Sequence, residues 1–73
     1  MMTDERLSLL TFDHYRLSKP VAFKNMIADG TLWDTIAGKV TAYQDHVAVL
    51  IATGMSAIQA ESLGIETIIR ERG

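Results

Sequence analysis

The sequence predicts a mainly β fold, in which an N-terminal helix is followed by five short strands that close into a small, strongly bent barrel. Two observations carry this prediction. First, residues 38–52 form two segments that are rich in β-branched residues and meet at a short polar turn, as paired strands do. Second, Gly38 lies inside an alternating pattern over 31–43, and a glycine inside a strand usually marks a bend that lets a small sheet curl.

The stretch 41–53 also has a helical interpretation. Tyr43, Val47, Leu50 and Gly54 fall at helical spacing, which would place them on one face of a single helix. We prefer two strands, because the β-branched residues of this stretch lose side-chain freedom in a helix and pack well on a pleated surface.

Length and composition limit the class of protein. The chain has 73 residues, which predicts one domain over 1–73, and 48% of them are hydrophobic. It has no cysteine, so neither a disulfide nor a thiolate metal site can stabilise it. A domain of this size buries only about 60% of its unfolded surface. We therefore expect the missing burial to come from a partner or from copies of the same chain, and a homo-oligomer is the prediction.

The charge pattern and the apolar runs bear on partners and location. The formal net charge of −2 argues against a strong non-specific affinity for nucleic acid, although 14–44 carries four Lys and Arg residues against two Asp residues. The longest apolar run, 47–52, is far too short to span a membrane, and no basic cluster opens the chain as in a signal peptide. The sequence thus predicts a soluble, cytoplasmic protein.

The first predicted element is a helix over 4–17. Thr3 is a good N-cap, and the two acidic residues that follow it suit the positive end of a helix dipole. From Leu7 onward, apolar side chains recur at helical spacing on a face that includes His14. Pro20 stops the helix, because the residue before a proline is disfavoured in helical conformation.

The segment 20–29 fits a strand or a helix. Ser18 as N-cap, Pro20 in the first turn and Gly30 beyond the end would make a helix. The strand interpretation uses the alternation of apolar side chains and the turn Asp29-Gly30, which is a strong hairpin signal. We favour the strand.

The remaining elements complete the predicted barrel over 20–69. After the central pair, 55–60 is a short strand, or a helix in which Ser56 is the N-cap and Gln59 completes a capping box. The apolar residues of 65–69 form the last strand. The charged residues of 70–73 form a solvated tail.

The order of these elements resembles the Sm-like fold, in which a helix precedes five strands and the second strand bends at a glycine. The motifs that are similar to its bacterial Hfq branch are Pro20-Val21, Asp29-Gly30, Gly38-Lys39-Val40-Thr41-Ala42-Tyr43, Val47-Ala48-Val49-Leu50 and Gly64-Ile65-Glu66-Thr67-Ile68-Ile69. The resemblance spans about residues 20–69. It implies a ring, a hexamer or heptamer, that binds single-stranded RNA as a post-transcriptional regulator without catalysis or a cofactor.

The same resemblance implies the RNA-binding residues. RNA would contact the turn that contains Tyr43, Asp45 and His46, with Arg16 and Lys19 at the rim of the ring. The sequence departs from the family here, because Asp45 occupies a polar position beside the path of the RNA backbone and would repel its phosphates. The Lys-His pair that the family carries before its last strand is also absent.

The oligomer interface is predicted from two apolar edges. In Sm-like rings, the fourth strand of one subunit pairs with the last strand of the next. Here those edges would carry Met55, Ala57 and Ile58 on one strand, and Ile65 and Ile68 on the other. Natural proteins cover or pair such edges.

We expect neither a catalytic site nor a metal site. His14 and His46 are the only histidines, and no nucleophile lies in a recognisable motif. His14 is expected to pack in the interior. His46 beside Asp45 fits a plain turn, a base-stacking residue or half of a metal or acid–base site. Trp33 is either core beneath the helix or an exposed interface anchor.

Two other function classes compete with the RNA-binding ring. In a helix-turn-helix DNA-binding regulator, as in small phage excisionases, 11–30 would be the helix-turn-helix and 31–43 a wing. Its recognition helix would carry only Lys24, which weakens that interpretation. The third class is a protein-binding ring or adaptor that has lost RNA binding.

Overall fold

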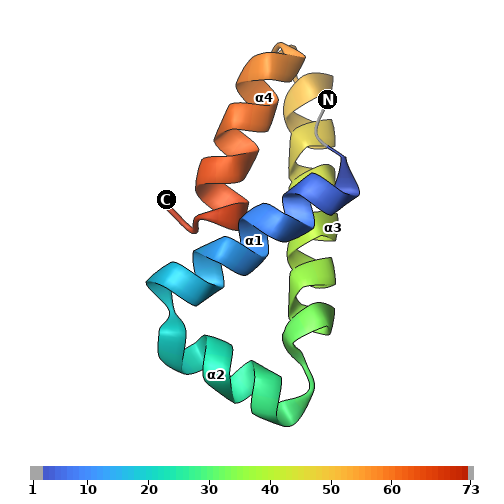
Figure 1. The fold of residues 1–73 in the computed structure, drawn as a ribbon. Helices are drawn as coiled ribbons and strands as arrows, with labels where there is room; N and C mark the ends of the chain where they lie inside the picture. The colour runs from blue at the N-terminus through green and yellow to red at the C-terminus, as the bar shows by residue number, and fades with distance from the viewer. Residues whose placement is uncertain (1–2, 73) are drawn as a thin grey trace.

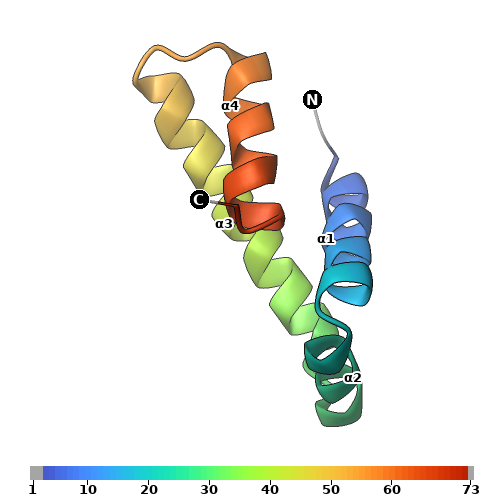
Figure 2. The same cartoon turned by 90° about the vertical axis from the view of Figure 1, so that its left-hand side faces the viewer.

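The longest helix organises the protein, and every other helix packs on it. The computed structural model describes residues 3–72 and has, in that range, α1 (Asp4–Ser18), α2 (Pro20–Asp29), α3 (Leu32–Ala52), α4 (Ala57–Gly64) and the π-helical segment η1 (Ile65–Ile69). α4 and η1 run back along α3, α1 crosses α3 obliquely, and α2 connects α1 to α3 (Figure 1). In the turned view of Figure 2, α1 and α4 are both drawn on the same side of the upper half of α3, with α4 nearer to it. The molecule is elongated, 42 × 18 × 16 Å.

The predicted β-barrel over 20–69 is wrong, and so is the Sm-like architecture, because residues 3–72 contain no strand. Both segments of the predicted central pair belong to α3. The residues that α3 buries are spaced three or four apart, and they are Leu32, Ile36, Val40, Tyr43 and Val47. A strand would have buried Val49 and Ile51 with Val47, but both are exposed. The helical alternative for 41–53 is the correct one.

The helix predicted over 4–17 is confirmed by α1. The hydroxyl of Thr3 accepts a hydrogen bond from the Arg6 amide at 3.2 Å, so the predicted N-cap is present. Leu7, Thr11 and Tyr15, four residues apart, form the buried face. Thr11 is fully buried, and its hydroxyl is satisfied by donating to the Leu7 carbonyl at 2.8 Å.

The strand predicted over 20–29 is also wrong, since this segment is the helix α2. Pro20 begins it, where its missing N–H costs no hydrogen bond, and Gly30 ends it in the left-handed region at φ 74°. The Gly30 amide donates to the Ile27 carbonyl, as in a helix C-cap rather than a hairpin turn. α2 buries no residue fully, so it lies at the edge of the core.

The helix pair α3–α4 is close-packed. Ser56 begins α4, and its hydroxyl accepts from the Gln59 amide at 3.3 Å, so 55–60 is not a strand. Ala60 is fully buried, and Gly64 lies so close to α3 that a Cβ there would be 2.8 Å from the Tyr43 ring. Small residues on α4 thus let the two backbones approach.

The last predicted strand, 65–69, is the π-helical segment η1. The Arg70 amide donates to the Ile65 carbonyl at 2.8 Å, which is the spacing of a π-turn. Ile69 is buried in the core, and residues 70–72 follow without regular structure. Met1, Met2 and Gly73, which the predicted domain and tail included, lie outside the described residues.

Candidate protein-interaction surface

The structure does not bring the predicted RNA-binding residues together. Tyr43, Asp45 and His46 lie in the middle of α3 rather than in a turn. The side chain of Gln44 donates to Asp4, so the first turn of α1 lies beside them. Arg16 is twelve residues further along α1, which is about 18 Å at 1.5 Å per residue, and Lys19 is further still.

Each of these residues has a different environment. Tyr43 is core, and burial raises the pKa of its hydroxyl, with the negative charge of Glu61 adding to the shift. Asp45 is exposed and His46 is half-buried. Arg16 pairs with the Asp13 carboxylate at 3.3 Å. None of these arrangements presents an aromatic face beside free cations, which is what a stacked RNA base requires.

The predicted strand edges of the oligomer interface are wrong, since neither segment is a strand: residues 57–60 begin α4, and 65–69 form η1. Ala57 is exposed and Ile58 is 82% exposed in the first turn of α4, and Met55 is half-buried just before it. Ile65 and Ile68 are half-buried against the core on η1. Exposed apolar surface therefore remains at Ile58, whereas η1 already packs on the rest of the chain.

A cluster of aromatic rings lies where α1, α2 and α3 meet. The ring of Phe12 is 5.1 Å from that of Phe23 in an edge-to-face contact and 5.8 Å from that of Trp33 in a stacked contact. Phe12 and Phe23 are half-buried, whereas Trp33 is 61% exposed. The packing of Phe12 against Trp33 fixes one side of the indole and leaves the rest to solvent.

Two exposed aliphatic side chains extend this cluster. Leu9 lies one turn before Phe12 on α1, and Ile27 lines a small hollow of about 160 Å³ together with Trp33. We call Leu9, Phe12, Phe23, Ile27 and Trp33 the aromatic patch. Large exposed apolar patches on soluble proteins mark interaction sites, and tryptophan is one of the residues enriched among their energetic hot spots. The sequence predicts Trp33 as either core or interface anchor, and its exposure fits the anchor.

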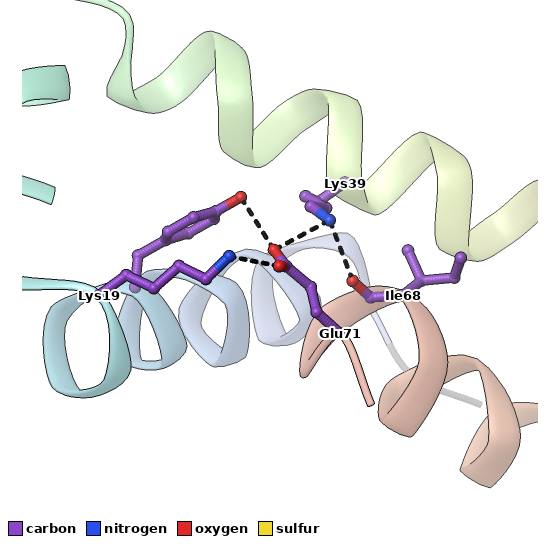
Figure 3. Close-up of polar contacts among 5 residues, drawn as sticks. Lys19, Lys39, Ile68 and Glu71 are labelled. Atoms are coloured by element: carbon purple, nitrogen blue, oxygen red, sulfur yellow. Dashed lines mark hydrogen bonds and ion pairs between the residues drawn. The ribbon is translucent and has the colours of Figure 1, made fainter. Parts of the chain in front are cut away.

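A second feature is an ion-pair cluster that fixes the C-terminal segment. The carboxylate of Glu71 accepts from the Nζ of Lys19 and lies 3.1 Å from the Nζ of Lys39, and the Tyr15 hydroxyl donates to it at 3.4 Å (Figure 3). Lys39 also donates to the Ile68 carbonyl at 3.4 Å. The hydrogen bonds from both lysines lower the pKa of Glu71 to about 2. The predicted solvated tail is thus anchored to α1 and α3.

Sequence reasoning missed this cluster for a physical reason. Glu71 is 52 residues from Lys19 and 32 from Lys39, and no local spacing rule connects side chains so far apart. Glu71 also has a positive φ of 56°, which turns the chain after η1. No pattern in the sequence indicated that turn.

Other kinds of site lack support in the described part of the chain. Residues 3–72 contain no group of three or more His, Asp or Glu side chains that could hold a metal ion. None of the helices described is both long and apolar enough to cross a membrane. Burial lowers the pKa of His14, opposed by Glu71, and its Nε2 has no hydrogen-bond partner among these residues.

Comparisons with known proteins do not identify the chain. Neither family models, nor curated proteins, nor solved structures give a match. The RNA-binding function stays a prediction from sequence motifs, while the barrel that accompanied it is wrong. The helical class of residues 3–72 agrees better with the two other function classes, the helix-turn-helix regulator and the protein-binding adaptor.

Proposed function

We propose that this chain is a small helical adaptor, without catalysis, that binds another protein through the aromatic patch. The observation that carries the proposal is that Trp33 stacks on the half-buried ring of Phe12 and is nevertheless 61% exposed. A tryptophan held from one side loses little conformational freedom when a partner covers its other side. That is the property of an interface anchor.

The shortage of core supports the same proposal. In residues 3–72, nine large hydrophobic side chains are exposed, as many as the hydrophobic residues that are buried. Three of these nine, Leu9, Ile27 and Trp33, belong to the aromatic patch, and burying apolar area there would stabilise by about 25 cal/mol per Å². A partner protein, a second copy included, supplies that cover.

The charge arrangement disfavours nucleic acid as the partner. The seven Lys and Arg side chains are spread along the chain from Arg6 in α1 to Arg72 after η1, and the formal net charge of the chain is −2. The helix-turn-helix predicted over 11–30 corresponds to the end of α1 and to α2, and α2 carries one cation, Lys24; the wing predicted over 31–43 is wrong, because residues 32–43 belong to α3. Specific DNA recognition depends on several phosphate contacts.

The experiment compares two variants with equal exposure. Trp33 and Val49 are both 61% exposed, but Val49 lies outside the patch. Immobilised Trp33→Ser should lose the partner that the wild-type chain captures from its source cells, by about tenfold or more, whereas Val49→Ser should retain it. Equal capture by all three proteins would contradict the proposal.

A second measurement identifies self-association. Sedimentation of the wild-type chain gives the mass in solution, and emission from Trp33, the one tryptophan, reports whether the indole is covered. If the partner is a second copy, the mass should double and the emission should shift to shorter wavelength as concentration rises. With a different partner, both changes should need that partner.

A further inference from the structure

A groove of about 440 Å³ lies between α1 and the C-terminal segment. Leu10, Leu17 and Ile69 supply its apolar lining, and His14 lies between the two leucines on the α1 wall. At 100° per residue, this wall is on the flank of α1 opposite to Leu9 and Phe12. The groove is therefore a surface separate from the aromatic patch.

The charged residues that line the groove are two arginines and one aspartate. Arg70 and Arg72 line it, each with its Nη1 on one shared carboxylate, that of Glu66, at 2.8 and 3.4 Å. A guanidinium has five N–H donors, so each arginine keeps donors for another acceptor. Asp13 also lines the groove, but its charge is balanced by Arg16.

The surroundings of the groove have a net positive charge in a protein that is negative overall. The side chains of Lys19, Lys39, Arg70 and Arg72 contribute four positive charges there, against two negative ones from Glu66 and Glu71, which leaves +2. The formal charge of the whole chain is −2. This end of the molecule therefore favours an anionic group.

The ion pairs of Glu71 hold the backbone between the two arginines against α1 and α3. Glu71 lies between Arg70 and Arg72 in the chain, and its carboxylate is held by Lys19 and Lys39 on the side that faces α1 and α3 (Figure 3). Arg70 and Arg72 line the groove instead. Glu71 thus has a positioning role through the backbone, because it ties the segment that carries both arginines to α1 and α3, while Glu66 holds their guanidinium groups.

The dimensions and chemistry of the groove indicate its occupant. The α1 wall from Leu10 to Leu17 is about 10 Å long, the length of three to four extended residues. Such a segment needs an aliphatic side chain for the leucines and a carboxylate for the guanidinium groups, which bind carboxylates in a planar, paired geometry. A chain that offers both is a short acidic and aliphatic peptide.

We propose that this groove binds a short extended segment of a partner protein, in which a carboxylate side chain lies beside an aliphatic one. The proposal extends the proposed adaptor function to a second surface and rests on it for the nature of the partner. Its own test does not depend on the aromatic patch, because the Trp33→Ser variant should bind the same peptide as tightly as the wild-type chain.

The test uses the full ¹⁵N-labelled chain and a blocked tetrapeptide, Leu-Glu-Asp-Leu, with Leu-Gln-Asn-Leu as its uncharged match. The acidic peptide should shift the amide signals of the α1 wall and of 69–72, with a dissociation constant of about 1 mM or below. Arg70→Gln should weaken binding about threefold or more, whereas Lys24→Gln, an exposed cation on α2, should not change it.

Several outcomes would overturn the proposal. Equal shifts from both peptides would mean that the arginines do not bind a carboxylate. Equal shifts from octanoate or from inorganic phosphate would assign the groove to a small anion, and preferential binding of hexauridylate would assign it to RNA. An absence of shifts at about 5 mM acidic peptide would leave no peptide site there, whatever the aromatic patch binds.

A further variant separates positioning from net charge. Glu71→Gln makes the groove surroundings more positive, so charge alone predicts tighter binding of the acidic peptide. Loss of the ion pairs to Lys19 and Lys39 releases the segment that directs Arg70 and Arg72, so the positioning role predicts weaker binding, about threefold or more. Tighter binding would overturn the positioning role of Glu71.

Discussion

Two glycine-to-alanine changes should shift stability in opposite directions. Gly64 and Gly38 both have helical backbone, in α4 and α3, so alanine is conformationally permitted at each. In an exposed helix interior, this replacement stabilises by about 1 kcal/mol, because glycine loses more backbone entropy on folding. The surroundings of the added methyl group therefore decide the sign.

The surroundings of Gly64 are full. A Cβ there would lie 2.8 and 2.9 Å from two atoms of the Tyr43 ring and 2.9 Å from a methyl group of Val47, all closer than carbon atoms pack. Because Tyr43 and Val47 are buried in the core, α4 would have to move away from α3. Overpacking of this kind costs about 1–3 kcal/mol. After the gain in helix propensity, Gly64→Ala should lower the free energy of unfolding by about 1 kcal/mol.

Gly38 is the matched control, because a Cβ there meets no atom within 4 Å. Gly38→Ala should raise the free energy of unfolding by about 0.5–1 kcal/mol. Thermal and denaturant unfolding measure both changes, and 1 kcal/mol corresponds to about 4–8 °C in a domain of this size. Stabilisation by both variants would refute the close contact of α4 with α3, and destabilisation by Gly38→Ala would refute a continuous helix at that position.

Two more stability predictions follow from the ion pairs and the caps. The pKa of Glu71 is about 2 in the folded protein against an ordinary value of 4.5, so its contribution to stability is present above pH 4.5 and is lost as the pH falls towards 2. Glu71→Gln should lower the free energy of unfolding by about 1 kcal/mol near neutral pH, after discounting for solvent screening. In denaturant titrations it should also flatten the dependence of stability on acid pH. An unchanged pH dependence would contradict the pairing with Lys19 and Lys39. Ser56→Ala should lower the free energy of unfolding by about 1 kcal/mol, because the hydroxyl caps α4 by accepting from the Gln59 amide. A decrease of less than a few tenths of a kcal/mol in the same titrations would contradict that cap.

The candidate sites could be predicted from the sequence only in part. The single tryptophan was identified as core or interface anchor, and its exposure agrees with the anchor. The stacking of Phe12 on Trp33 joins helices that local patterns do not connect. The groove could not be predicted from local patterns, because its two walls, 10–18 and 69–72, come from opposite ends of the chain.

The sequence by itself determined several of the helix ends. Thr3 before two acidic residues predicted the start of α1, and the same local chemistry at Ser56 gave the helical alternative for 55–60. Pro20 and Gly30 bounded the helical alternative for 20–29, which is α2. These signals are reliable because each depends on the conformation of one residue or on a hydrogen bond three residues away.

Only the tertiary structure decided whether the β-branched stretch 38–52 is a strand pair or a helix. Its propensity favours strands by a fraction of a kcal/mol per residue. In α3, the helical spacing buries Val40, Tyr43 and Val47 against α1 and the α4–η1 segment and leaves Val49 exposed. Burial of a large apolar side chain stabilises by about 1.5–3 kcal/mol, so packing outweighed propensity.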